Sequence, residues 1–102
     1  MIIKKKEDEV IVIPEGKIDF SNAEDFKENV LNIYNEGYRK IIIDLSNVST
    51  IDSSGLGKIL LFHKKLQEKD GELIIRNITS DYVRKMFNMI NLDKIINIDG
   101  IN

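Results

Sequence analysis

Runs of β-branched residues occupy both ends of the first fourteen positions of the chain. Residues Ile2 to Lys6 and Val10 to Ile13 flank the polar segment Glu7-Asp8-Glu9, a pattern that predicts a β-hairpin. Pro14 ends the second arm because proline cannot donate a hydrogen bond to a neighbouring strand. Gly16 then allows a bend. We therefore expect an antiparallel pair of strands at the start of the fold.

Helical periodicity begins after this hairpin. Ser21 stands three residues before Glu24, which is the spacing of a capping box, and Gly37 supplies a left-handed stop. The apolar positions between them are Ala23, Phe26, Val30, Ile33 and Tyr34. Their spacing predicts a first helix with one buried face.

Two further segments have the spacing of helices. The second helix should begin near Ser53 or Ser54, run to about Lys69 and end at Gly71, and the third should follow Thr79-Ser80-Asp81. The apolar faces are predicted to hold Leu56, Ile59, Leu60, His63 and Leu66 in the second helix and Val83, Met86, Phe87 and Ile90 in the third. His63 on such a face is interpreted as a packed or half-buried histidine with a local partner.

Three strands alternate with these helices. Residues 40–45 contain three consecutive isoleucines, which indicates a central strand covered on both faces. Residues 72–76 form another strand, and residues 94–98 a last short one. Strands that alternate with helices imply crossover connections and a mostly parallel inner sheet. The predicted fold class is α/β, a mixed β-sheet with an N-terminal antiparallel hairpin, mostly parallel inner strands and helices packed against it.

Composition limits the function more than it defines it. The 102 residues suit one domain, 1–102, and the net charge of −2 from 15 basic and 17 acidic residues does not favour binding to nucleic acid. No stretch of 18 apolar residues and no signal-peptide pattern occurs, so we expect a cytoplasmic protein with no membrane partner. The chain has no cysteine and one histidine, His63. We expect no metal and no cofactor.

The most informative segment is residues 50–57, Thr-Ile-Asp-Ser-Ser-Gly-Leu-Gly, which joins the triple-isoleucine strand to the second helix. Asp52, Ser53 and Ser54 are three good N-cap residues in succession, and one would suffice. Gly55 and Gly57 each cost about 1 kcal/mol relative to alanine within a helix. A cap and a turn explain such a run in most proteins. The alternative is that another molecule approaches the bare backbone here.

Three enzyme-like or ligand-binding interpretations fit the chain poorly. A serine nucleophile requires a base and a preceding glycine, whereas the glycines here follow the serines. A dinucleotide fingerprint would require a third glycine where Leu60 stands, and there is no Walker A sequence. Asp44 ends a strand as in a phosphoaspartate receiver, but no acidic pair follows the first strand. We therefore expect no enzymatic activity and no catalytic residue.

The whole chain resembles the STAS-domain family, and within it the anti-sigma factor antagonists. The matching segments are Glu15-Gly16-Lys17-Ile18-Asp19, Ile42-Ile43-Asp44-Leu45, Ile51-Asp52-Ser53-Ser54-Gly55-Leu56-Gly57, Gly71-Glu72-Leu73, Met86-Phe87 and Leu92-Asp93-Lys94-Ile95-Ile96. In that family the serine after the aspartate is phosphorylated by an anti-sigma factor that is a serine kinase. The unphosphorylated protein binds the anti-sigma factor and releases the sigma factor, and a serine phosphatase resets the cycle.

The resemblance implies a role for individual residues. Ser53 is the expected phosphorylation site, with Ser54 as the alternative, and Asp19 corresponds to a family position at the partner surface. The expected partner-binding residues are Asp19, Asp52, Ser53, Ser54, Gly55, Leu56, Gly57 and Leu61. Leu61 is included because the helical spacing places it as an exposed leucine on the polar side of the second helix. Asp52 is interpreted as a cap, or alternatively as an electrostatic helper of phosphoryl transfer, and Lys58 as a solvated lysine, or alternatively as a phosphate contact. We expect a monomer or a weak dimer.

Two other functions remain compatible with the sequence. STAS domains also occur in anion transporters and in stress-sensing assemblies, so this chain could be a component of another signalling assembly. A small-molecule or nucleotide-binding module is the other alternative. The lack of a membrane segment or a sensor domain favours the small antagonist.

Overall fold

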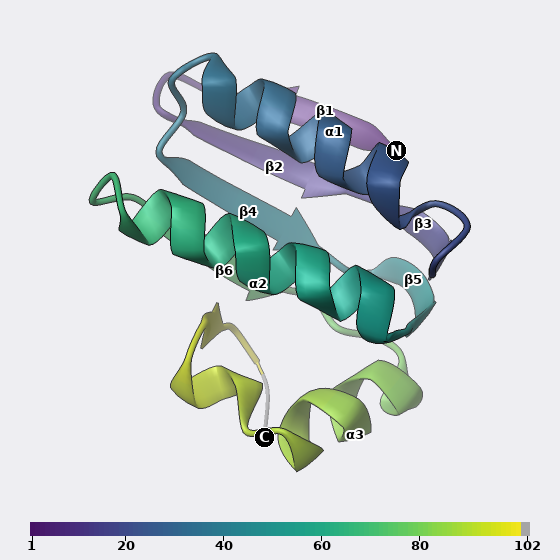
Figure 1. Ribbon diagram of the computed structural model, residues 1–102. Helices are drawn as coiled ribbons and strands as arrows, with labels where there is room; N and C mark the ends of the chain where they lie inside the picture. Colours follow the sequence, from purple (N-terminus) through teal and green to yellow (C-terminus); the bar gives the residue numbers. More distant parts are fainter. Residues whose placement is uncertain (101–102) are drawn as a thin grey trace.

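Two helices lie side by side across one face of a five-stranded sheet in the computed structural model, which describes residues 1–100 (Figure 1). They are α1 (Ala23–Asn35) and α2 (Ser53–Gln67). The strands, in their order across the sheet, are β1 (Ile2–Lys5), β2 (Glu9–Ile13), β4 (Lys40–Asp44), β6 (Glu72–Arg76) and β7 (Asn97–Ile98). β1 and β2 are antiparallel and the other pairs are parallel, which confirms the predicted mixed sheet and its hairpin.

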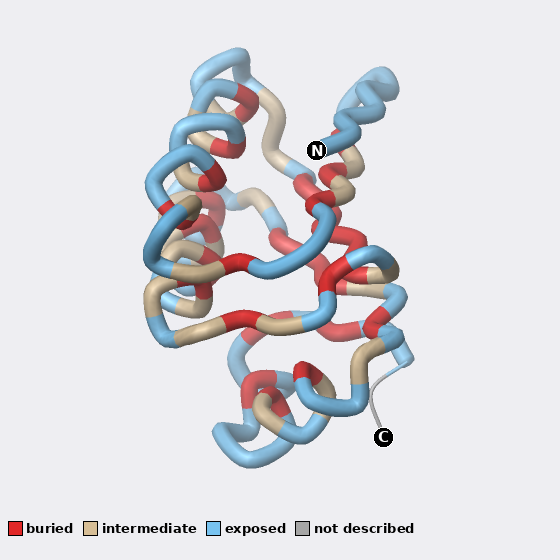
Figure 2. Tube along the Cα trace, turned by 90° about the vertical axis from the view of Figure 1, so that its right-hand side faces the viewer, coloured by how far each residue is buried: buried red, intermediate tan, exposed pale blue. Residues whose placement is uncertain are grey.

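The central strand of this sheet is β4, as the three isoleucines predict. Ile41 and Ile43 belong to the core, and Figure 2 shows the buried positions concentrated between the helices and the sheet. Ile42 is buried as well and pairs with Ile11 of β2 and Ile74 of β6, on the opposite side of the sheet. Both faces of β4 are therefore apolar, which explains why its sequence does not alternate.

A second, smaller sheet was not predicted from the sequence. β3 (Glu15–Ile18) and β5 (Asn47–Ile51) pair in parallel, with an irregularity in register between Gly16 and Lys17. Residues 50 and 51 were expected to lie in the loop before α2, and instead they end the strand β5, which leads directly into that helix. This pair of strands carries the starts of both α1 and α2, which Figure 1 shows at the same end of the molecule.

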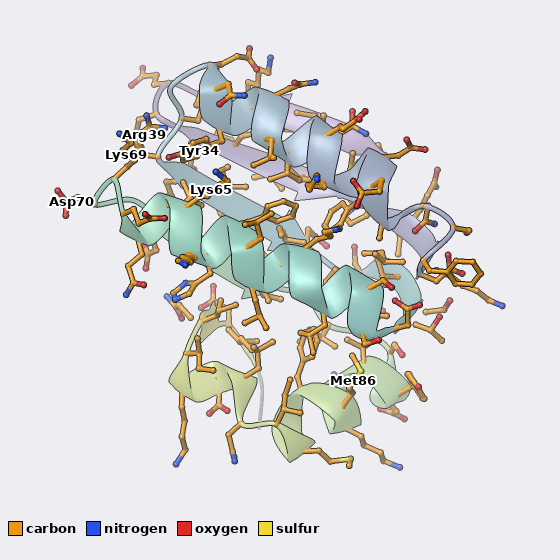
Figure 3. All side chains as sticks on the ribbon, in the orientation of Figure 1. Tyr34, Arg39, Lys65, Lys69, Asp70 and Met86 are labelled. Carbon is orange, nitrogen blue, oxygen red and sulfur yellow. The ribbon has the colours of Figure 1, made fainter. Side chains whose placement is uncertain are left out.

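The two helices pack through aromatic side chains. The rings of Phe26 and Phe62 meet edge to face with centroids 5.3 Å apart. At the opposite end of the helix pair from the small sheet, Tyr34 lies between the charged groups of Arg39, 4.8 Å from the ring centroid, and Lys65, 5.9 Å from it (Figure 3). Within residues 1–100, no helix is long and apolar enough to cross a membrane.

The start of α1 differs from the predicted capping box. The N-cap position is Asn22, and it makes no side-chain cap bond. Ser21 donates its hydroxyl to Asp19 Oδ1 at 2.5 Å, and Glu24 pairs with Lys27 and Lys58. The prediction was wrong because the Ser21 hydroxyl, which would have capped the helix, is hydrogen-bonded to the carboxylate of Asp19.

The third helix begins where it was predicted. α3 (Asp81–Met89) is capped by Ser80, whose hydroxyl accepts the backbone N–H of Val83 at 3.2 Å. The segment 94–98 is shorter as a strand than expected, because the 3-10 helix η1 (Leu92–Lys94) precedes β7. Phe26 and Phe87 are buried and Met86 packs against the core, as predicted.

The end of α2 depends on Asp70 and Gly71 in different ways. The left-handed residue is Asp70, with φ of 58°. Gly71 is required for a close approach instead, since a Cβ atom there would lie 2.4 Å from the carbonyl oxygen of Arg39. Gly71 lies at the end of the helix, as predicted. Its role there is to allow close packing against the loop before β4.

Asp44 is the buried charged residue of the described chain, and it joins two loops. Its Oδ1 accepts the backbone N–H of Ser46 at 2.9 Å, and its Oδ2 accepts Nδ2 of Asn77 at 2.8 Å. Burial alone would raise the pKa of Asp44, but the hydrogen bonds from Ser46 and Asn77 outweigh burial and lower it. The ionised carboxylate therefore stabilises the fold.

We predict that Asp44→Asn lowers the free energy of unfolding by about 1–3 kcal/mol, because an amide cannot accept both hydrogen bonds. Since the folded-state pKa is lowered, the carboxylate's contribution is present above about pH 4 and is lost as the pH falls further. Urea unfolding at pH 7 and at pH 3 should show that the difference between the variant and the parent shrinks in acid. Asp8→Asn, in the exposed hairpin turn, is the matched control. An equal loss in both variants would contradict this role of Asp44.

Candidate functional site

The N-terminus of α2 is held by Asp52, the residue that precedes its first turn. Asp52 has extended backbone geometry, with φ of −97° and ψ of −175°, and its Oδ1 accepts the backbone N–H of Gly55 at 3.0 Å. Its carbonyl oxygen accepts the N–H of Leu56 at 2.9 Å. This is the geometry of an N-cap residue. The cap interpretation of Asp52 is therefore confirmed.

Asp52 also connects α2 to the loop between β3 and α1. Its second carboxylate oxygen, Oδ2, accepts the backbone N–H of Phe20 at 3.0 Å, and its own N–H donates to the carbonyl oxygen of Ile18 at 3.0 Å. One side chain thus satisfies backbone donors in two segments more than thirty positions apart in the sequence. The two segments are consequently joined at this carboxylate.

Ser53 lies at the first helical position and is exposed, whereas Ser54, one residue further, is half-buried. In the part of the chain that the structure describes, neither hydroxyl is engaged in a hydrogen bond. The first N–H groups of a helix have no partner within the helix, and they give its start a partial positive charge. The Ser53 hydroxyl therefore stands in solvent beside backbone donors that can bind an anion.

The two glycines of this turn differ in their surroundings. A Cβ atom at Gly55 would lie 2.7 Å from Cγ2 of Ile18 and 3.0 Å from Cγ2 of Ile51. Gly55 is buried because these side chains pack directly against it. The sequence suggested that another molecule approaches the backbone here, but it is the protein's own strand β3 that does so. A Cβ atom at Gly57 would meet nothing within 4 Å. Gly57 is exposed and leaves open space beside the first turn of the helix.

The buried face of α2 is rotated relative to the prediction. Its buried residues are Gly55, Ile59, Phe62 and Leu66, with Leu56 partly buried against the core. Leu60 is exposed and Leu61 is half-buried, so the prediction that Leu60 lies in the core and Leu61 is the exposed leucine was wrong. The unpredicted Phe62 occupies the core through its contact with Phe26.

The sequence analysis also assigned roles to two polar residues of α2, Lys58 and His63. Lys58 is bound to Glu24 of α1, with Nζ 2.8 Å from Oε1, and this contact lowers the pKa of Glu24. Lys58 thus joins the two helices and is not simply a solvated lysine. His63 is half-buried, as expected. No hydrogen bond to a local partner is seen for it within residues 1–100.

The loop that carries Asp19 is fixed by its own hydrogen bonds. Asp19 Oδ1 accepts the backbone N–H of Ser21 at 3.0 Å as well as its hydroxyl, and these bonds lower the pKa of Asp19. Between these residues stands Phe20, with 81% of its surface exposed. The sequence prediction did not select Phe20. Its signal is an isolated aromatic residue between two polar residues in a loop.

The comparisons with known proteins agree with this architecture. The model of the family described as "STAS domain" matches residues 1–100. A Thermotoga neapolitana homologue of the protein TM1081 is 34% identical over 93 residues, which are 90% of this chain and 81% of the relative. The anti-sigma-B factor antagonist of Staphylococcus aureus is 30% identical over 84 residues, 82% of this chain and 77% of the relative.

A solved structure gives the same result in three dimensions. The crystal structure of TM1081 from Thermotoga maritima matches with a TM-score of 0.89 and 33% identity, over 95% of this chain and 83% of that one. The chain therefore belongs to the STAS domain family, and within it to the anti-sigma factor antagonists. This confirms the family and the fold that the sequence resemblance implied.

We predict different effects on stability when each of the two glycines at the α2 N-terminus is replaced by alanine. Gly55→Ala should lower the free energy of unfolding by about 1–3 kcal/mol, because the new methyl group would overlap Ile18 and Ile51. Gly57→Ala should leave stability unchanged or raise it by up to about 1 kcal/mol, since alanine is the better helix former and the space is open. Urea denaturation of both variants measures the difference, and a loss at Gly57 as large as that at Gly55 would refute this description.

Proposed function

We propose that this protein binds an anti-sigma factor that is also a serine kinase, and that phosphorylation of Ser53 ends the binding. The observation that supports the proposal is the position of Ser53, whose exposed hydroxyl stands at the first turn of α2, next to the Asp52 cap. In the unphosphorylated state the protein would hold the anti-sigma factor and thereby release the sigma factor. A serine phosphatase would restore this state, and the exchange would take place in the cytoplasm.

The proposed reaction places a phosphate where the fold can hold one. Transfer of the γ-phosphoryl group of ATP to Oγ of Ser53 forms one O–P bond and breaks the bond to the departing ADP, while a base of the kinase takes the hydroxyl proton. The product dianion would lie beside the unpaired N–H groups of the α2 N-terminus. Since Ser53 is exposed, the modification requires no rearrangement of the core.

Structures of a more distant relative support a fold that tolerates the phosphate. SpoIIAA, described as an anti-sigma factor antagonist, has been solved in its unphosphorylated form and, as a Bacillus cell fate determinant, in its phosphorylated form. This chain matches the two with TM-scores of 0.70 and 0.74. At 24% and 23% identity the likeness concerns the fold alone. We infer that phosphorylation acts on the surface of this protein and leaves its fold unchanged.

The phosphate would oppose binding through charge and size. Phosphorylation adds a charge of about −1.5 to −2, which must be desolvated if Ser53 lies within the interface. A hundredfold loss of affinity requires only about 2.7 kcal/mol. Burying the dianion under a partner that supplies no matching positive charge costs more than that amount. The carboxylates of Asp19 and Asp52 are themselves negatively charged, so they cannot neutralise the phosphate.

Two alternatives to this proposal concern the same site. Ser54 could accept the phosphate in place of Ser53, although its half-buried position makes it less accessible to a kinase. A STAS component of another signalling assembly would share the fold and differ in its partner. In that case the protein would not capture an anti-sigma factor kinase.

We predict that incubation with the anti-sigma factor kinase of the same organism and ATP adds one phosphoryl group, about 80 Da, to Ser53. Intact-mass and peptide mass spectrometry measure the addition and its position. Ser54→Ala should still be modified and Ser53→Ala should not, because Ser53 is exposed whereas Ser54 is half-buried. Modification of Ser53→Ala but not of Ser54→Ala would transfer the assignment to Ser54.

Binding to the same kinase provides the second test. Ser53→Ala should bind at least as tightly as the parent and remain bound in the presence of ATP, whereas Ser53→Asp should bind about a hundredfold more weakly because of the added charge. Isothermal titration calorimetry gives both dissociation constants. Equal affinity of Ser53→Asp and the parent would contradict the proposed switch.

A further inference from the structure

Phe20 is a large apolar side chain that the fold leaves in solvent. Its exposed fraction is 81%, and among the described large hydrophobic residues only Met89, at 82%, is as exposed. Isolated apolar residues are common on protein surfaces, so exposure by itself does not indicate a binding site. What distinguishes Phe20 is the structure of the loop that presents it.

The Phe20 loop, residues 19–22, is held by hydrogen bonds on both sides of the exposed ring. Asn22 donates Nδ2 to the carbonyl oxygen of Lys17 at 2.7 Å and accepts the N–H of Asp19 at 2.9 Å. The carbonyl oxygen of Asp19 accepts the N–H groups of Asn22, at 3.1 Å, and Ala23, at 2.8 Å. Together with the bonds of Ser21 to Asp19, these contacts fix the backbone before any partner arrives.

The same loop is tied to the phosphoacceptor turn. The N–H of Phe20 itself donates to Asp52 Oδ2, and Asp52 directly precedes Ser53. The side chain of Asp52 is thereby committed to holding Phe20 on one side and capping α2 on the other. The backbone of Phe20 is thus joined through one side chain to the residue that precedes Ser53, and both Phe20 and Ser53 are exposed.

We propose that Phe20 is the apolar anchor with which this protein docks on its anti-sigma factor kinase, its ring entering an apolar pocket of that kinase. This inference rests on the proposed function and adds a specific contact to it. Buried aromatic residues contribute a disproportionate part of the binding energy at protein interfaces. A rigid loop increases that contribution, because little conformational freedom remains to be lost on binding.

The position of Phe20 also separates recognition from the phosphorylation chemistry. The ring lies in the loop before α1, whereas the reacting hydroxyl lies at the start of α2. Phe20 is therefore a docking residue that does not take part in phosphoryl transfer. Its removal should weaken formation of the complex and leave the reaction within the complex unchanged.

The experiment compares Phe20→Ala with Met89→Ala, in which an equally exposed apolar side chain at the end of α3 is removed. We expect Phe20→Ala to raise the dissociation constant for the kinase about 30-fold and Met89→Ala to change it less than about threefold. In steady-state phosphorylation of Ser53, Phe20→Ala should raise KM with kcat nearly unchanged. Phe20→Leu, which keeps an apolar group, should recover part of the affinity.

The outcomes separate this inference from the proposed function. If the parent binds the kinase and Phe20→Ala binds equally well, the Phe20 anchor is refuted and the proposed function stands. If the parent neither binds nor is phosphorylated, the proposed function is refuted and the anchor with it. Thermal unfolding of Phe20→Ala should match that of the parent, because the exposed ring contributes little to the core. A lowered melting temperature together with equal losses in Phe20→Ala and Met89→Ala would also count against the anchor.

Discussion

The geometry of the candidate functional site depends on the carboxylate of Asp52. One oxygen caps α2 at Gly55 and the other holds the N–H of Phe20, so two loops that are distant in sequence are fixed at one point. The backbone of Asp52 adds a third bond, to Ile18 of β3. Close packing of Gly55 against Ile18 completes the junction and leaves no room for a side chain there. The Asp-Ser-Ser-Gly sequence thus joins the start of α2 to β3. Ser53 is exposed because the residues on either side of it, Asp52 and Gly55, make these contacts.

The main features of the fold could be predicted because the relevant signals are local. Three consecutive isoleucines indicate a strand with two apolar faces, and β4 is the centre of the sheet. The small sheet could not be predicted in this way. β3 and β5 are short and contain glycine, lysine, serine and threonine. Within residues 1–100 they pair only with each other, so no single segment carries their signal. Their pairing follows from the tertiary structure.

The candidate site was predicted in part, for similar reasons. Asp52 caps the helix and Ser53 is exposed, as the motif indicated. The capping box at Ser21 matched its pattern, but the neighbouring Asp19 competes for the hydroxyl. Leu60 and Leu61 were exchanged because a helical wheel gives no absolute orientation, and Phe62 sets it by contact with Phe26. Phe20 has no periodicity that could have revealed it. The role proposed for it is argued from the hydrogen bonds of its loop, which connect residues distant in the sequence.

The parallel pairing of β3 with β5 has a consequence for biosynthesis. Strand β3 ends at Ile18, and its partner β5 ends at Ile51, immediately before Asp52. A ribosome-bound chain in which only the first forty residues have emerged lacks both the partner strand and the carboxylate that holds Phe20. The proposed docking surface therefore assembles late, when α1, β4 and β5 have been synthesised and have packed onto the first strands. Under the proposed function, only a chain that has folded completely would be able to bind the partner.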